Sequence, residues 1–462
     1  MSSRAAAPPA APTHDNRWWL VVAVGLAVFM AMLDMTIVGI ALPNIGAEFG
    51  ASPDALAWAL LGYLLPLVGL TLPAGRWLDR VGKRSALVAS TGGFVLASVA
   101  AGLSPNIGWL VGARVVQGCC AAVLFALGPA IAAAAVRPEA RGRAFSLVAT
   151  VGPLGGVTGP ALGGLLVDGL GWPWTFYINL PVGLAVIGIG LAQLPAEGVL
   201  RWPERGLIAE AALLSVAALT LLGGMSLGAS RGVGWLLLTV VAIPPACAWQ
   251  RSTGGRHVRR LLQLPGVWHP HAALLTQATS AGVVVFLIPF YLQGTLDLSA
   301  TTTGLTILAF PLAALLFGPA GGVLADCWSA RGTALIGVSL FALGIVATVP
   351  LSPAWTVADL AWRLALIGAG AGLFSGPNQA VAMSAAPRML HATTGATTSL
   401  ARQLGFSLGP ALATTAWAVA GYSTFGMRTA MAVATGAGCI ALLTLARGAW
   451  SPRPAKLTHA HF

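Results

Sequence analysis

The feature that most constrains this chain is a series of long apolar stretches that recurs from near residue 18 to near residue 446. Each stretch has about 17–25 residues, the length that an α-helix needs to cross about 30 Å of hydrocarbon. Only 8% of the residues are charged, against about 25% in soluble domains, so this chain cannot build a water-facing surface. We therefore predict an all-α membrane protein with about fourteen spans. The spans are expected near residues 18–42, 54–74, 86–103, 106–130, 143–167, 172–194, 205–228, 233–249, 271–293, 302–325, 333–350, 357–384, 393–419 and 425–446.

The net charge of +12 does not indicate a nucleic-acid partner, because the basic residues lie in short breaks between apolar stretches. If the N-terminus is cytoplasmic, twenty of the 25 Lys and Arg residues fall in cytoplasmic segments and two in outer loops. This bias follows the rule that positive residues stay inside. It predicts a multi-pass protein of the cell (cytoplasmic) membrane with both termini in the cytoplasm.

The sequence gives little sign of an enzyme or a metal protein. The five cysteines form no CxxC pair and lie in or beside apolar stretches, as small buried hydrophobic residues do. His269 and His271 flank Pro270 without further ligands, which is weak evidence for a metal. No GxxxxGK[ST] phosphate loop is present. We expect no enzyme activity, no metal and no cofactor, and we regard a membrane enzyme or sensor as the least favoured class.

Weak internal repeats indicate two related halves. Gly75 and Asp79 match Gly322 and Asp326, and the segment TGPAL at 158–162 matches LGPAL at 408–412, each about 250 residues apart. Secondary transporters are built from such repeats, with the substrate site between the halves. The domains are expected as a disordered tail at 1–17, a six-helix bundle at 18–200, two linker helices and a loop at 201–260, a second six-helix bundle at 261–450 and a tail at 451–462.

Asp34 is the most informative residue, because it lies well inside the first apolar stretch. A carboxylate inside a membrane is expensive and is functional by default. Burial disfavours its charged form and a nearby cation favours it. Arg114 is predicted at a similar depth, about 12 Å from the outer end of its own span, so the two side chains can pair. A packing role for Asp34, or an Arg114 that reaches outward to the membrane surface, are the alternatives.

Two further segments carry motifs. In the segment GRWLDRVGKR, at 75–84, Gly75 and Gly82 permit a tight turn. Arg80 and Arg84 anchor the segment in the cytoplasm, and Asp79 is an acid among these cations. The alternative is that this segment is an ordinary charged loop. In GPLGGVTGPALGG, at 152–164, small residues predict a stripe against which another helix packs closely. Its members are Gly155, Gly159, Gly163 and Gly164, with Pro160 expected to kink the helix.

Arg402 lies roughly in the middle of the thirteenth stretch. It could contact an anionic group or a carbonyl, and interior packing is an equal alternative. Because Asp34 is the one clear deep acid, the sequence favours a monovalent cation or a neutral compound over a dication as substrate.

These motifs together resemble the major facilitator superfamily, and within it the fourteen-span drug/proton antiporters. LDMTIVGIALP resembles the first-helix motif at Asp34, and GRWLDRVGKR resembles the loop motif at Gly75, Asp79, Arg80, Gly82 and Arg84. RVVQGCCAA resembles the fourth-helix motif at Arg114, Gln117 and Gly118, and the glycine stripe resembles the antiporter helix motif.

The resemblance implies two six-helix bundles with two extra central helices, alternating access and the proton-motive force as energy source. It implies that Asp34 and Arg114 couple protons and that the Asp79 loop braces the two halves. Gln117, in the matched fourth-helix motif, and Arg402, in the middle of its span, are candidate cavity residues. We therefore expect a proton-coupled exporter of small amphipathic drugs or antibiotics. The alternative is a proton-coupled or facilitative transporter of one metabolite.

Overall fold

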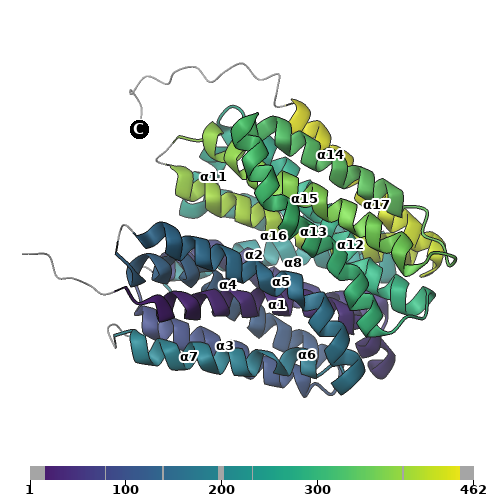
Figure 1. Ribbon diagram of the computed structural model, residues 1–462, viewed down its shortest axis with the longest axis horizontal. Helices are drawn as coiled ribbons and strands as arrows, with labels where there is room; N and C mark the ends of the chain where they lie inside the picture. Colours follow the sequence, from purple (N-terminus) through teal and green to yellow (C-terminus); the bar gives the residue numbers. More distant parts are fainter. Residues whose placement is uncertain are drawn as a thin grey trace, which may run out of the picture.

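The computed structural model describes residues 16–78, 80–137, 140–195, 202–231, 233–387 and 390–447, and this part of the chain contains helices and no strand. Figure 1 shows two bundles of nearly parallel helices lying side by side. The first bundle contains α1 (Trp18–Phe49), α2 (Pro53–Leu78), α3 (Lys83–Gly102), α4 (Ile107–Ala135), α5 (Arg141–Leu170), α6 (Trp174–Tyr177) and α7 (Asn179–Gln193). The predicted tails at 1–17 and 451–462 lie outside the described residues, except for residues 16 and 17.

The second bundle and the segment that joins it to the first are also helical. The linker contains α8 (Arg205–Arg231), η2 (Val233–Leu236), α9 (Leu237–Val241), α10 (Ile243–Arg251) and α11 (Thr253–Gln263). The second bundle contains α12 (Trp268–Phe290), η3 (Tyr291–Thr295), α13 (Ala300–Cys327), α14 (Ala330–Thr348), α15 (Val357–Ala385), α16 (His391–Val419) and α17 (Thr424–Arg447).

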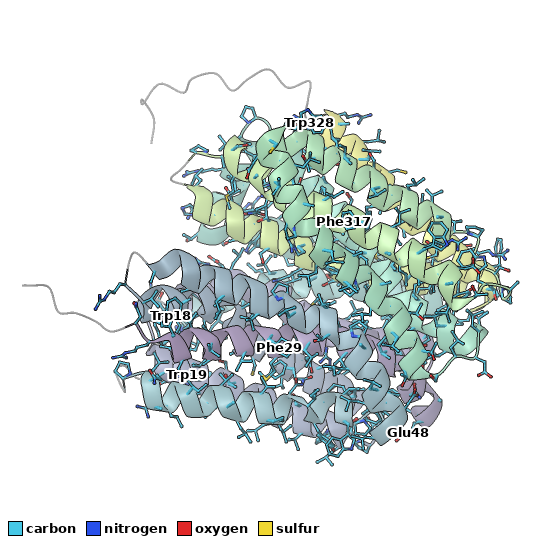
Figure 2. The ribbon with its side chains drawn as sticks, viewed as in Figure 1. Trp18, Trp19, Phe29, Glu48, Phe317 and Trp328 are labelled. Carbon is cyan, nitrogen blue, oxygen red and sulfur yellow. The ribbon has the colours of Figure 1, made fainter. Side chains whose placement is uncertain are left out.

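The outer surface of the bundles is apolar. Leu316, Leu343 and Leu443 are each more than half exposed. So large an exposed apolar surface is unfavourable in water and is typical of a surface that contacts lipid. Exposed tryptophans lie near both ends of the helices, as at membrane interfaces. They are Trp18, Trp19, Trp202, Trp268 and Trp328 on the side where α1 begins and α17 ends, here the terminus side, and Trp109, Trp174, Trp235 and Trp362 on the opposite side. Figure 2 shows Trp18 and Trp19 at one end of α1 and Glu48 at the other.

Eleven helices of the described chain are long and apolar enough to cross a membrane. The helices α5 and α16 lie outside that set and occupy the spans predicted near 143–167 and 393–419. The span predicted near 233–249 is broken into η2, α9 and α10, and Pro244 and Pro245 stand at the start of α10. Proline lacks the N–H that continues a helix, so this interval forms no single long helix.

The packing reproduces the internal repeat. In the first bundle α1 packs on α5 and α2 on α4; in the second, α12 packs on α16 and α13 on α15. Contacts between the bundles are paired in the same way, since α5 meets α13 and α16 meets α2. The linker helix α8 packs against both α2 and α16, and Thr415 Oγ1 donates to the Met225 carbonyl over 3.1 Å. The fold is therefore two six-span bundles with the linker helix beside their boundary.

Candidate functional site

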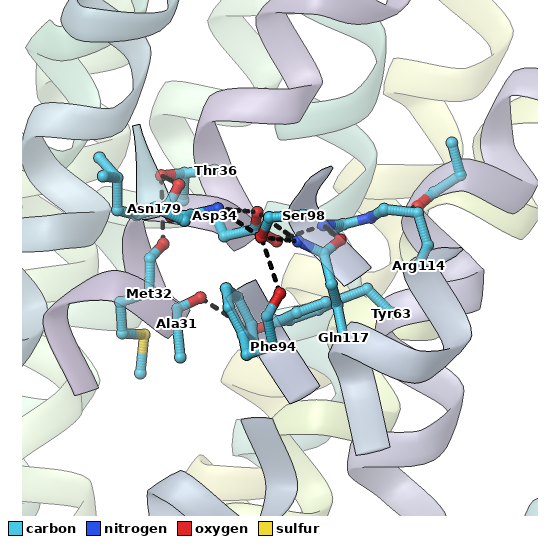
Figure 3. Close-up of polar contacts among 12 residues, drawn as sticks. Ala31, Met32, Asp34, Thr36, Tyr63, Phe94, Ser98, Arg114, Gln117 and Asn179 are labelled. Atoms are coloured by element: carbon cyan, nitrogen blue, oxygen red, sulfur yellow. Dashed lines mark hydrogen bonds and ion pairs between the residues drawn. The ribbon is translucent and has the colours of Figure 1, made fainter. Parts of the chain in front are cut away.

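The centre of the site is an ion pair inside the first bundle. Asp34 lies near the middle of α1, and its side chain accepts a hydrogen bond from Arg114 Nη1 of α4. Both side chains are fully buried. A buried charge pair of this kind is stable only when further hydrogen bonds satisfy its remaining atoms. Figure 3 shows that the neighbouring helices supply them.

Two amides complete the shell of Asp34. Asp34 Oδ1 accepts from Asn179 Nδ2 of α7 over 2.8 Å and from Gln117 Nε2 of α4 over 3.1 Å. Gln117 also accepts from Arg114 Nη1 over 2.9 Å, and Ser98 Oγ of α3 accepts from Gln117 over 2.8 Å. Four helices thus hold one carboxylate, whose two oxygens accept three donors.

Arg114 is held as firmly as its partner. Its Nε donates to the Ala59 carbonyl of α2 over 3.0 Å, and its guanidinium carbon lies 4.4 Å from the centre of the Tyr63 ring. The Tyr63 hydroxyl in turn donates to the Ala31 carbonyl over 2.8 Å. Arg114 Nη2 is buried with no hydrogen-bond partner. A cation fixed in this way over an aromatic face depends on Asp34 for its counter-charge.

A cavity of about 90 Å³ adjoins this pair at the boundary between the bundles. It is lined by Met35, Thr36, Leu60, Tyr63, Leu64, Arg114, Gly282, Val285, Phe310, Phe406 and Pro410. A water molecule occupies about 30 Å³ in the liquid, and drug-sized ligands occupy pockets of about 300–1,000 Å³. The cavity therefore has room for a few waters in this conformation, and entry of a larger molecule requires the bundles to separate.

The structure thus brings Asp34 and Arg114 together, as their depths suggested. Gln117, a candidate cavity residue, is fully buried, donates to Asp34 and is absent from the lining of this cavity. It lies three residues after Arg114 on α4 and therefore on the same face, which explains its contact with Asp34. Arg402 is absent from the cavity lining but lies one turn from Phe406, which lines it.

Sequence reasoning missed three contributors. Asn179 and Ser98 touch Asp34 or its partners, and Tyr63 covers Arg114. Asn179 could have been recognised as a candidate site residue, because it is an amide between apolar residues of the sixth predicted span. Ser98 could not, because serine is common in membrane helices and its hydroxyl usually bonds to a carbonyl of its own helix.

The glycine stripe of α5 packs closely, as predicted, but against two partners. A Cβ on Gly155, Gly159 or Gly163 would run into atoms of α1. A Cβ on Gly164 would run into the Ala300 carbonyl of α13, and so into the other bundle. Adjacent residues of a helix point about 100° apart, which is why Gly163 and Gly164 face different neighbours. Pro160 lies inside α5 as expected.

The loop motif differs from expectation. Gly75 lies inside α2, and Gly82 precedes α3 with φ −61° and ψ 123°, a conformation that any residue can adopt. The connection therefore needs no glycine for a tight turn. Arg80 pairs with Glu204, and Arg84 Nη1 donates to the Leu194 carbonyl over 3.4 Å. Asp79 lies outside the described residues.

One more ion pair ties α2 to the linker on the terminus side. Arg76 of α2 pairs with Glu210 of α8, whose side chain is 8% exposed. Glu210 Oε1 also accepts from the Gly254 amide at the start of α11 over 3.1 Å. The carboxylate therefore faces both a cation and the positive end of a helix.

On the opposite side, hydrogen bonds join the two bundles directly. Asp168 of α5 accepts from the Ala300 amide over 3.1 Å and from the Thr301 amide over 2.6 Å, both at the start of α13. Gln293 Nε2 donates to the Ile40 carbonyl over 3.0 Å.

A third contact on this side is made by the connection between α16 and α17. The Tyr422 hydroxyl donates to Asp54 Oδ1 of α2 over 3.2 Å. Burial, and after it the Asp54 carboxylate, raise the pKa of Tyr422 to about 12. The opposite side is therefore sealed in this conformation.

This chain is similar to curated proteins whose names refer to multidrug resistance, export or transport. It is 31% identical to the Multidrug resistance protein B homolog of Mycobacterium tuberculosis (strain ATCC 25618 / H37Rv), covering 84% of this chain and 74% of that protein. It is 29% identical to the Tetracenomycin C resistance and export protein of Streptomyces glaucescens, with 87% and 76% covered. It is 27% identical to the Riboflavin transporter RibZ of Clostridioides difficile (strain 630), with 86% and 87% covered.

The fold has a close counterpart among solved structures. A bacterial homolog to the human lysosomal transporter Spinster, in an inward-facing and occupied conformation, superposes with a TM-score of 0.69. The match covers 95% of this chain and 99% of that chain at 18% identity, so it speaks for the fold alone. Residues 24–410, and again 271–460, match the family described as Major Facilitator Superfamily. The chain therefore belongs to the major facilitator superfamily of transporters.

Proposed function

We propose that this transporter is a proton-coupled exporter of small amphipathic compounds from the fourteen-span drug/proton antiporter branch. It would lie in the cytoplasmic membrane with the terminus side in the cytoplasm, an orientation that the distribution of basic residues supports. The observation that carries the proposal is the buried pair of Asp34 and Arg114 beside the cavity between the bundles.

The pair suits proton coupling because its two states differ strongly in energy. With Asp34 charged, its two oxygens accept three donors and the net charge of the pair is zero. When Asp34 takes up a proton, Arg114 becomes a buried cation without a counter-ion, which costs several kcal/mol. Because Arg114 also lines the cavity, a substrate entering there changes the same electrostatic balance. Proton uptake at Asp34 and substrate binding in the cavity are therefore coupled through Arg114.

Alternating access follows from how the bundles meet. The hydrogen bonds of Asp168, Gln293 and Tyr422 close the side opposite the termini. Asp34 is fully buried, so a proton reaches it only after the bundles rearrange. We propose that this rearrangement opens the sealed side, exposes the pair to external protons and releases the substrate outward.

The test compares Asp34→Asn with Asp297→Asn, a matched change of an exposed acid between η3 and α13 whose positive φ asparagine also tolerates. Cells that lack their own pumps express each variant, and drug accumulation is measured with and without a protonophore. Wild type and Asp297→Asn should lower accumulation, and both the protonophore and Asp34→Asn should abolish this effect. Transport at the wild-type rate by Asp34→Asn, with its pH dependence intact, would falsify the proposal.

A second candidate is a transporter dedicated to one metabolite, which the similarity to the protein named Riboflavin transporter RibZ favours. Vesicle assays with riboflavin and imposed pH gradients of both signs separate the two. Antiport is accelerated when the side that receives substrate is the more acidic, and symport when it is the less acidic. A facilitative carrier responds to neither gradient.

A further inference from the structure

Arg402 is a cation in a membrane-spanning helix and makes no hydrogen bond to Asp34 or to the residues that contact Asp34 in the described chain. It lies eleven residues after His391, where α16 begins, which places it about 16 Å along the helix. Its side chain is exposed, although the residue lies well inside α16. Within the described residues its guanidinium makes no hydrogen bond or ion pair. An arginine at this depth is expensive without a partner, and none of the described residues supplies one.

The contacts of α16 show where Arg402 points. Gly405 and Gly409 pack on α12, and Gln403 Oε1 accepts from the Thr71 hydroxyl of α2 over 3.0 Å. On a helix with 100° per residue, Arg402 falls between these two directions and beside Phe406. Phe406 and Pro410 line the cavity. Arg402 therefore faces the space between the bundles, one turn from the cavity towards the terminus side, and Figure 1 places α16 at this boundary.

No free acid of the described chain balances this charge. Asp34 is fully buried and its oxygens are taken by Arg114, Gln117 and Asn179. The remaining described acids lie at or near helix ends: Glu48, Asp54, Asp168, Glu204, Glu210, Asp297, Asp326 and Asp359. Among the described residues, no acid lines the cavity and none pairs with Arg402.

We propose that Arg402 binds the anionic group of the substrate, so that the transported class is amphipathic organic anions such as carboxylates, sulfonates and ionised phenols. The apolar part of the molecule would lie against Phe310, Phe406 and Tyr63, the aromatic side chains of the cavity. Guanidinium is suited to this task because its fork of donors matches planar oxyanions. The sequence favoured a monovalent cation or a neutral compound over a dication as substrate, but both Asp34 oxygens already accept donors from Arg114, Gln117 and Asn179. This assignment rests on the proposed function and narrows it to one charge class.

The test uses two dyes that share the xanthene ring system and differ in charge: fluorescein, an anion, and a cationic rhodamine ester. Their affinities for the full-length protein in lipid nanodiscs are measured by fluorescence anisotropy, without any proton gradient. The variants are Arg402→Gln, Arg402→Lys and, as a matched control, Arg259→Gln, which removes an exposed cation of α11.

Wild type and Arg259→Gln should bind fluorescein more tightly than the rhodamine ester. Arg402→Gln should weaken fluorescein about tenfold or more, the worth of a hydrogen bond to a charged group, and leave the rhodamine ester unchanged within about twofold. Arg402→Lys should fall between the two, because it keeps the charge without the fork.

Three results overturn the assignment: unchanged fluorescein affinity in Arg402→Gln, equal weakening of both dyes, or a wild-type protein that does not prefer fluorescein. Since binding is measured without a gradient, it is independent of the Asp34→Asn transport test. Failure of proton coupling and failure of anion recognition are therefore seen separately.

Discussion

Replacing Asp168 by Ala should open the side of the transporter that is closed in this structure. The carboxylate of Asp168 belongs to the first bundle and caps the start of α13 in the second, through the amides of Ala300 and Thr301. These two hydrogen bonds exist only while the bundles meet on that side. Their loss therefore destabilises the closed conformation and leaves each bundle intact.

The size of the effect follows from the two bonds and their exposure. A hydrogen bond to a charged group contributes about 1.5–3 kcal/mol when buried, and an acid at a helix start about 0.3–1 kcal/mol at the surface. Asp168 is exposed, so water recovers much of the loss. We expect a net change of about 1–2 kcal/mol, which shifts the ratio of closed to open molecules by about 5- to 30-fold.

The shift can be measured as a distance between labels on the two bundles. Leu103 and Phe425 are each 68% exposed, on the side opposite the termini and in different bundles. After replacement of the native cysteines, spin labels at these positions should show a longer distance population in Asp168→Ala.

The matched control is Asp359→Ala. Asp359 caps the start of its own helix, α15, within the second bundle. It should lower stability without separating the bundles. An unchanged distance distribution in folded Asp168→Ala, or the same change in Asp359→Ala, refutes the reasoning.

Three further outcomes follow from the contacts. Gly164→Leu should lower the transport rate by at least about tenfold in a folded protein. The new Cβ would lie 2.7 Å from the Thr301 Cα and would prevent the two bundles from closing on this side. Transport rates in proteoliposomes measure this effect. Asn179→Leu should lower the melting temperature, because Asp34 loses a donor worth about 1–3 kcal/mol. Tyr422, with its pKa raised to about 12, keeps its proton at neutral pH, so its contribution to stability persists up to about pH 10 and is lost as pH rises through 12. Melting curves of wild type and Tyr422→Phe should converge in that window.

The parts of the fold that could be predicted from the sequence are those set by local pattern. Span length and apolar content fixed the helices, and α1 and α4 carry Asp34 and Arg114 at depths that allow them to meet. The packing of the α5 glycines on a neighbouring helix was predictable, because small residues permit close approach wherever they lie in a membrane. Pro244 and Pro245 also indicated a break in the interval 233–249. A span was nevertheless predicted there because the interval is apolar.

The parts that could not be predicted depend on which helices become neighbours. Nothing in the sequence says that Asn179 of α7 reaches Asp34, since 145 residues separate them. The same limit hides the role of Gly164, whose partner on α13 lies in the other bundle. The fourth-helix motif made Gln117 a candidate cavity residue, and its contact with Asp34 likewise depends on how α1 and α4 pack together. The local sequence determines which residues share one face of a helix, whereas the whole fold determines which helix packs against that face.

The two proposed sites lie in different bundles, and the charges that they would bind have an energetic consequence. In this proposal Asp34 of the first bundle binds the proton and Arg402 of the second binds the substrate anion. Inward movement of a proton and outward movement of a monovalent anion both carry positive charge into the cell. A membrane potential of about 100 mV contributes about 2.3 kcal/mol for each charge that crosses it. One exchange moves two positive charges inward and therefore gains about 5 kcal/mol from this potential alone. Exchange of a proton for a monovalent cation would gain nothing from it. A transporter built this way exports anions even where the pH gradient is absent, whereas one built to bind cations at Asp34 would stop.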